Sequence, residues 1–167
     1  MALNEDLEKI GIQERALHLP RLDAQFAWDL GTRIRALATE RGLSLAIDVR
    51  RFGQPLFYSA LEATTADNAE WVRRKSNVVS RFHRSSYAVG MTLKVKGTKL
   101  LERYGLPVAD YAADGGSFPL IVENAGIVGS VTVSGLPQRD DHNLVVEALC
   151  ALLGRDFAAL RLGPESA

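Results

Sequence analysis

The spacing of hydrophobic and polar residues changes several times along the first half of the chain, and each change predicts an element. From Leu22 to Arg41 the apolar residues recur at helical spacing, and Gly42 follows as a helix stop. Residues 43–50 alternate between apolar and polar, as a half-buried strand does. Residues 56–60 predict a second strand. The break at 52–55 then makes the two strands an antiparallel hairpin.

The second half of the chain predicts two more helices, a hairpin and a final helix. Asp67 and Glu70 resemble a capping box, which predicts a helix over 67–82. Residues 87–96 fit either a helix or a strand, and we favour a helix because Gly97 follows. Two β-rich runs, 119–123 and 127–134, flank a turn that contains a glycine. Asp140 or Asp141 then caps an amphipathic helix that ends before residue 154.

This order of elements predicts the fold class. Strands joined by hairpins, with helices before, between and after them, indicate an α+β fold with a central, mostly antiparallel sheet flanked by helices. The length of 167 residues is ordinary for one domain, so we expect a single domain over 1–167 with its core at about 22–153.

Composition places the chain among ordinary globular proteins, with 47% hydrophobic and 24% charged residues. The acidic N-terminus lacks an apolar signal region, and no run of about 20 apolar residues exists, so we expect a cytoplasmic protein without a membrane span. Cys150 is the single cysteine, which excludes an internal disulfide. It lies on an apolar helical pattern, and we expect it in the core.

The charge is balanced overall, with 20 basic and 20 acidic residues, but it is uneven along the chain. Residues 71–101 contain eight Lys or Arg and no Asp or Glu. Such a segment either attracts an anionic ligand or nucleic acid, or pairs with acidic elements of the same fold or of another subunit. No nucleic-acid-binding motif accompanies it, so we do not expect nucleic acid as a partner.

Lys75 is the most unusual residue of the predicted 67–82 helix, because it lies on the apolar stripe between Trp71 and Val78. An ammonium group there must reach solvent, find a partner or accept a lowered pKa. Facing a pocket, it could bind a carboxylate or phosphate or act as a nucleophilic amine. Otherwise it pairs with an acidic residue or extends to water.

The Gly115-Gly116 turn has a structural explanation, because glycine reaches positive φ and allows close backbone approach. Its N–H groups could also form an anion-binding nest beside Ser117. For the iron of a haem, the sequence offers His18, His83 and His142 as ligands, with Met91 and several tyrosines as weaker options. His83 is the best placed for haem, because it adjoins Phe82 and the basic residues Arg81 and Arg84.

Three segments together resemble the GlcG/HbpS (haem-degrading-domain) family: Gly115-Gly116-Ser117-Phe118-Pro119-Leu120, Ile127 to Gly135, and Asp140-Asp141-His142. Trp71, Lys75 and Ser85-Ser86 point to a shorter branch of that family. The resemblance implies a profilin-like or sensor-like fold, assembly into homo-oligomers and, in some members, binding of haem or a related small molecule.

These observations favour a small-ligand-binding protein that accepts haem or another planar or anionic metabolite and works as a homo-oligomer. We expect Arg74 and Lys75 as anion contacts, Trp71 and Phe82 as apolar walls, Gly116 and Ser117 as backbone donors, and His83 as the haem iron ligand. Two alternatives stay open at this point. One is a haem-degrading or other oxidoreductase-type enzyme, and the other is a protein-interaction subunit without a small ligand.

Overall fold

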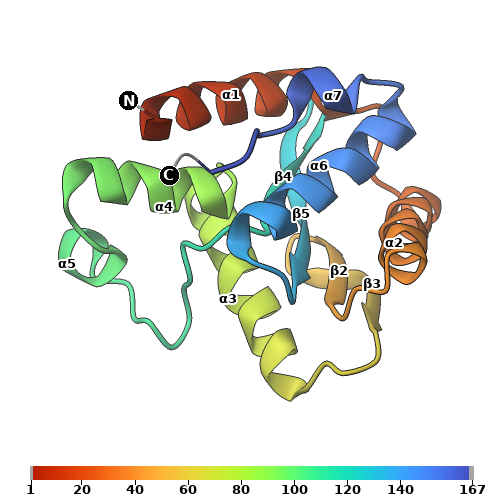
Figure 1. Ribbon diagram of the computed structural model, residues 1–167, viewed down its shortest axis with the longest axis horizontal. Helices are drawn as coiled ribbons and strands as arrows, with labels where there is room; N and C mark the ends of the chain where they lie inside the picture. Colours follow the sequence, from red (N-terminus) through yellow and green to blue (C-terminus); the bar gives the residue numbers. More distant parts are fainter. Residues whose placement is uncertain (1, 166–167) are drawn as a thin grey trace.

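The computed structural model describes residues 2–165, which form a five-stranded sheet flanked by helices (Figure 1). The helices are α1 (Ala2–Ala16), α2 (Ala24–Glu40), α3 (Ala66–Phe82), α4 (Ser86–Lys96), α5 (Leu100–Tyr104), α6 (Gln138–Leu153) and α7 (Phe157–Leu160). The strands are β1 (His18–Leu19), β2 (Ala46–Arg51), β3 (Gln54–Ala60), β4 (Ser117–Val122) and β5 (Gly126–Ser134). The α+β class predicted from the pattern is confirmed.

The sheet has the strand order β1-β4-β5-β2-β3. The pairs β2–β3, β2–β5 and β4–β5 are antiparallel, and only β1 runs parallel to its neighbour β4. The expectation of a mostly antiparallel sheet built from hairpins is therefore confirmed. The two-residue strand β1 was not predicted, because two residues are too few to show a period.

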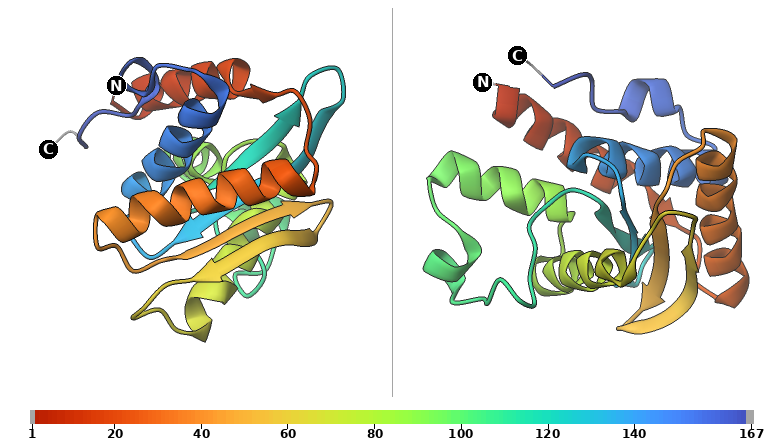
Figure 2. Two further views of the ribbon diagram at one scale, coloured as in Figure 1. Left: turned by 90° about the vertical axis from the view of Figure 1, so that its right-hand side faces the viewer. Right: turned by 60° about the horizontal axis from the view of Figure 1, so that its bottom comes forward.

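Helices cover both faces of the sheet, with α2 and α6 on one side and α3 on the other (Figures 1 and 2). Val131 and Val133 of β5 point into the main hydrophobic core beneath α2 and α6, and Cys150 lies in the same core, as expected. Because side chains alternate along a strand, Thr132 and Ser134 point to the α3 side. The layer under α3 is therefore built from small and polar side chains.

The helix starts show where the pattern was right and where it was wrong. Helix α4 is a helix, and Ser85 caps it by accepting the Ala88 N–H at 3.2 Å. The predicted cap of the third helix is wrong, because Thr65 and Asn68 form the capping box and the helix begins at Ala66. The predicted acidic cap of the helix that follows β5 is also wrong, because α6 begins after Pro137. Asp141 instead lies within the first turn of α6, and its side chain is buried.

Helix α1 and the segment around α7 pack against each other and onto α4 and α6 (Figure 2). Ile10 and Leu162 are buried with Tyr87 and Met91 in a second apolar cluster. Within residues 2–165, no helix combines the length and apolar character that a membrane span needs.

Candidate functional site

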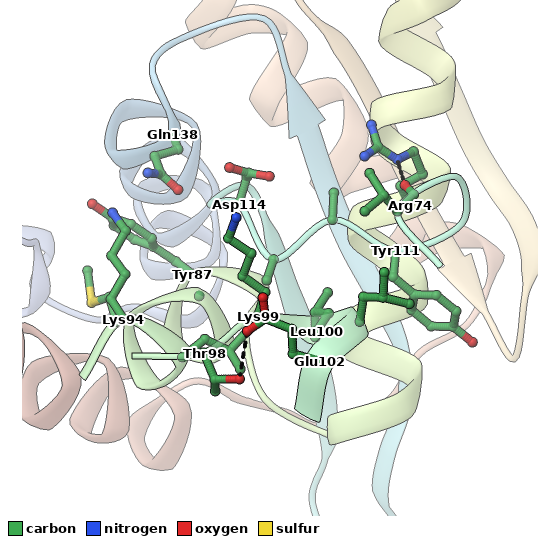
Figure 3. Close-up of a pocket in the computed structure, with 17 residues that line it drawn as sticks. Arg74, Tyr87, Lys94, Thr98, Lys99, Leu100, Glu102, Tyr111, Asp114 and Gln138 are labelled. Atoms are coloured by element: carbon green, nitrogen blue, oxygen red, sulfur yellow. Dashed lines mark hydrogen bonds between the residues drawn. The ribbon is translucent and has the colours of Figure 1, made fainter. Parts of the chain in front are cut away.

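A hollow that could hold a small molecule lies between α4, α5 and the loop of residues 106–114, and we call it the large pocket. Its volume is about 660 Å³, within the range of pockets that enclose small ligands. The lining is Arg74, Tyr87, Gly90, Met91, Leu93, Lys94, Thr98, Lys99, Leu100, Leu101, Glu102, Val108, Tyr111, Ala112, Ala113, Asp114 and Gln138. Figure 3 shows these side chains.

The walls of the large pocket are mostly apolar, and its charged groups lie at the rim. Leu93, Leu100 and Ala112 are buried parts of the wall, whereas Lys94 and Lys99 are exposed. Among residues 2–165, neither of these two ammonium groups forms an ion pair. The pocket therefore offers unpaired positive charge beside an apolar surface.

The charged lining of the large pocket is mixed. It contains the cations Arg74, Lys94 and Lys99 and the carboxylates of Glu102 and Asp114, so positive groups exceed negative ones by one.

The loop that closes the large pocket is fastened to α3. The Ala112 N–H donates to the Arg74 carbonyl at 3.2 Å, and Asn77 Nδ2 donates to the Asp110 carbonyl at 2.8 Å. A Cβ on Gly90 would collide with the Ala113 carbonyl, so the loop and α4 approach each other as closely as glycine permits. These contacts fix the pocket wall without a ligand.

Lys75 is 2% exposed, and its ammonium group is fully engaged within the protein. Nζ donates to the Gly115 carbonyl at 3.0 Å, to the Val133 carbonyl at 2.7 Å and to Asp141 Oδ2 at 3.3 Å. These are all the donors an ammonium has. Lys75 therefore joins α3 to the Gly115 turn, to β5 and to the first turn of α6. The expected anion contact is corrected: the internal partner is Asp141, and no donor is left for a ligand.

Burial governs the ionisation of this pair. It lowers the pKa of Lys75 and raises the pKa of Asp141, while the attraction between the two groups opposes both shifts. Asp141 also accepts the Leu136 N–H at 3.0 Å through Oδ1. The carboxylate thus holds the chain that enters α6, while the ammonium holds the turn that enters β4.

The Lys75 ammonium explains why the turn needs glycine at position 116. Gly116 has φ +136°, a conformation that side chains rarely adopt, and a Cβ there would collide with Lys75 Nζ. The glycine pair and the lysine, which the sequence presented as separate signals, are one packed unit.

A second hollow of about 210 Å³ lies beside this unit, and we call it the small pocket. Its lining is Trp71, Lys75, Asp114, Gly115, Leu136, Gln138 and Asp141. Asp114 and Gln138 line both pockets, so the two hollows are neighbours. Arg74 connects them from the α3 side: its guanidinium lies 4.5 Å from the Trp71 ring centre, and its Nε donates to the Val108 carbonyl at 2.9 Å.

Four of the expected site residues line neither pocket: Phe82, His83, Gly116 and Ser117. Ser117 is fully buried, and its N–H donates to Ser86 Oγ at 3.0 Å, so it cannot serve a ligand as a backbone donor. Phe82 packs edge-on against Tyr104, with ring centres 4.9 Å apart, and lines a different hollow. His83 is the exposed residue that ends α3, with φ +56°. Of the seven residues expected at the binding site, only Trp71, Arg74 and Lys75 line a pocket, and they are divided between two neighbouring pockets.

No histidine lines the large pocket, which bears on haem. His142 is 1% exposed on α6, where its Nε2 lies 2.8 Å from Gln13 Oε1 and its Nδ1 has no partner among the described residues. Burial lowers the pKa of His142 to about 3, so the ring is neutral. Across residues 2–165, no three metal-ligating side chains of His, Cys, Asp or Glu gather together. The iron donors that do line the large pocket are Tyr87, Met91 and Tyr111, and its basic rim suits propionates. The residues present therefore fit haem held by a ligand other than histidine.

The sequence interpretation missed most of the large pocket. The sequence presents Lys94 and Lys99 only as part of the basic segment, and it presents Met91 and the tyrosines only as weaker options for a haem ligand. Leu93 and Val108 gave no signal, because an apolar residue in a pocket wall resembles one in the core. Only the absence of acidic residues over 71–101 pointed toward this region.

Comparisons with known proteins agree with the fold. The sequence model described as "Haem degrading protein HbpS-like" matches residues 22–150. A UPF0303 protein of Burkholderia cenocepacia is 59% identical over 162 residues, covering 97% of this chain and 98% of the relative. A UPF0303 protein of Paraburkholderia phymatum is 57% identical over the same length and the same shares of both chains.

Solved structures share the same architecture. The crystal structure of the Ybr137w protein has a TM-score of 0.82 and 30% identity, covering 89% of this chain and 88% of that one. HbpS has a TM-score of 0.63 at 18% identity, covering 83% and 94%. A PduOC:haem complex has a TM-score of 0.67 at 12% identity, covering 78% and 94%. At these identities the last two show the fold alone. The match over 22–150 establishes that the chain belongs to the HbpS-like haem-degrading protein family.

Proposed function

We propose that the protein binds a small, largely apolar anion in the large pocket, and that haem is the first candidate. The observation that carries this proposal is the pairing of apolar walls with the unpaired ammonium groups of Lys94 and Lys99. An apolar surface takes up the body of a ligand, while a few polar groups fix its orientation. Arg74 adds a third positive charge on the α3 side of the pocket (Figure 3).

Haem combines the apolar body and the anionic groups that this pocket would bind. Its porphyrin is flat and apolar, and its two propionates need cationic partners, which the rim supplies. The family description names haem degradation, and the fold is shared with a protein solved as a haem complex. Both facts support the choice of haem for the first experiment.

Titration with hemin tests the proposal. We expect a shifted Soret band that saturates at one hemin per chain, and weaker binding by the Lys94→Ala/Lys99→Ala variant. Lys96→Ala is the matched control, because Lys96 lies on the same helix and does not line the pocket. Anilinonaphthalene sulfonate, a fluorescent apolar anion, serves as a second probe. If neither hemin nor this dye binds, the proposed function is wrong.

We also propose that the chain associates with copies of itself. Val95, Leu101 and Val108 are more than half exposed and all belong to the segment 95–108. Exposed apolar side chains gathered in one region are typical of interaction surfaces. Light scattering after size-exclusion chromatography should show a mass above 18.2 kDa for the wild type and a lower mass for Leu101→Glu. A wild-type mass equal to one chain at micromolar concentration would contradict this proposal.

A further inference from the structure

Few side chains in the wall of the large pocket can bind the iron of a haem. The side chains that bind haem iron in proteins are those of His, Cys, Met and Tyr. Of these, the pocket is lined by Tyr87, Met91 and Tyr111, with no His or Cys.

We infer that Tyr87 is the residue that binds the haem iron, through its phenolate oxygen. This inference rests on the proposed function, because it requires haem in the large pocket. It replaces His83, the ligand expected from the sequence, with a residue that lines the pocket.

Tyr87 differs from the other donors in what lies next to its oxygen. The guanidinium Nη1 of Arg139 is 3.5 Å from Tyr87 Oη, so a fixed positive charge adjoins the point where a phenolate would form. Arg139 is held in place by two bonds to Asp6, at 2.8 and 3.0 Å, and by the Gly163 carbonyl at 2.6 Å. Lys94 lies at the same end of the pocket as Tyr87 (Figure 3).

The two other donors are less suited to ferric iron. Met91 is buried in the same apolar cluster as Tyr87, but its neutral thioether is a soft ligand. Tyr111 lies at the opposite end of the pocket from Tyr87 (Figure 3). Among residues 2–165, no hydrogen bond links a cationic side chain to the Tyr111 oxygen.

The binding step exchanges a proton for iron. Without iron Tyr87 is a neutral phenol, and burial raises its pKa. As Oη bonds to ferric iron, the phenol proton passes to the water molecule that leaves the metal, and no electron moves. Arg139 then faces a phenolate, a charge that it stabilises better than it does the phenol. A phenolate prefers Fe(III) to Fe(II), so we expect the bond to weaken on reduction.

The test compares hemin with metal-free protoporphyrin IX, since only hemin can bond to Oη. For Tyr87→Phe we expect hemin affinity to fall at least tenfold, while affinity for protoporphyrin IX stays within about twofold, because phenylalanine keeps the ring and its packing. The wild-type hemin complex should show a high-spin ferric electron paramagnetic resonance signal and a phenolate-to-iron charge-transfer band, and Tyr87→Phe should lose that band. Tyr111→Phe is the matched control and should leave both affinities and the spectrum unchanged.

The outcomes separate this inference from the proposed function. If hemin binds wild type and Tyr87→Phe with equal affinity and equal spectra, Tyr87 is not the ligand and the pocket proposal stands. A low-spin signal that His83→Ala or His142→Gln abolishes would also overturn the inference. If protoporphyrin IX and anilinonaphthalene sulfonate bind and hemin gains nothing from its iron, the inference fails alone. If none of the three binds, both proposals fail.

Discussion

The two neighbouring pockets treat positive charge in opposite ways. In the small pocket Lys75 is almost completely buried, and each of its donors has a partner within the protein. In the large pocket Lys94 and Lys99 are exposed, form no ion pair and lie beside apolar walls. A cation whose donors are all used holds the fold together. A cation left without a partner at the mouth of an apolar pocket is available to a ligand.

This comparison reverses the ranking that the sequence suggested. Lys75 is unusual in the sequence because it places an ammonium on an apolar stripe, yet in the structure it holds a turn, a strand and a helix together. Lys94 and Lys99 look ordinary in the sequence because exposed lysines are common. The role of a charged side chain therefore follows from its partners in the structure more than from its position in the sequence.

Removing the Lys75 charge should have the largest effect on stability. Lys75→Met leaves the buried Asp141 without its partner, and we expect a loss of about 3–5 kcal/mol in the free energy of unfolding. Chemical denaturation measures this loss. The double variant Lys75→Met/Asp141→Asn should be more stable than the single variant. A single variant within about 1 kcal/mol of the wild type would show that Lys75 does not hold these segments.

The second-largest loss of stability is expected when a methyl group is added at the Gly115-Gly116 turn. Gly116→Ala combines a disfavoured φ with collisions against Lys75 Nζ and the Val133 backbone carbonyl, so we expect a loss of about 2–4 kcal/mol. Gly126→Ala is the control, because Gly126 also has positive φ but nothing lies within 4 Å of its added Cβ. Equal losses in thermal or chemical unfolding would mean that these two collisions add nothing.

Acid should destabilise the fold through His142. The pKa of this ring is about 3 in the folded protein and about 6.5 when unfolded, so the unfolded chain binds more protons between these values and stability falls as the pH drops. From pH 6.5 to pH 5 the contribution is roughly 2 kcal/mol. His142→Phe should lose less stability over this range than the wild type. Asp141 works in the opposite direction, because its pKa is raised to about 6 and the folded state binds the extra proton.

The smallest effect on stability is expected from substitutions at the rim of the large pocket. Lys99→Ala should leave the free energy of unfolding within about 0.5 kcal/mol of the wild type. It should weaken hemin binding by about two- to fivefold, as expected for one exposed charge. Raising the salt concentration should reduce the difference between variant and wild type. A variant that loses stability and keeps its affinity would contradict the distinction between the two pockets.

The sequence predicted the elements better than their contacts. Alternation over 43–50 and helical spacing over 22–41 reflect burial on one face, so they predicted a strand and a helix in the right places. The pattern placed Lys75 correctly on the buried face of α3 but could not show that Asp141, 66 residues later, would meet it. It also offered Asp140 or Asp141 as a helix cap, because a cap and an inward-facing carboxylate in the first turn look alike in a sequence.

The site was harder to predict because it depends on the loop of residues 106–114. Its position follows from several long-range hydrogen bonds to α3 and from the approach of Ala113 to Gly90, and none of these contacts has a local period. His83 looked suitable because aromatic and basic residues are its neighbours in sequence. At the end of α3 the chain turns through a left-handed residue, which leaves that imidazole on the surface.

The packing of Leu162 against Met91 and Tyr87 has a consequence for the order in which the protein is made. Leu162 follows every strand of the sheet in the chain, yet it is 1% exposed beside two residues that line the large pocket. During synthesis the sheet can pair before this residue leaves the ribosome, whereas the back of the pocket cannot close until it has emerged. A nascent chain whose strands have left the ribosome while position 162 is still inside it would therefore present a paired sheet with an unfinished binding site.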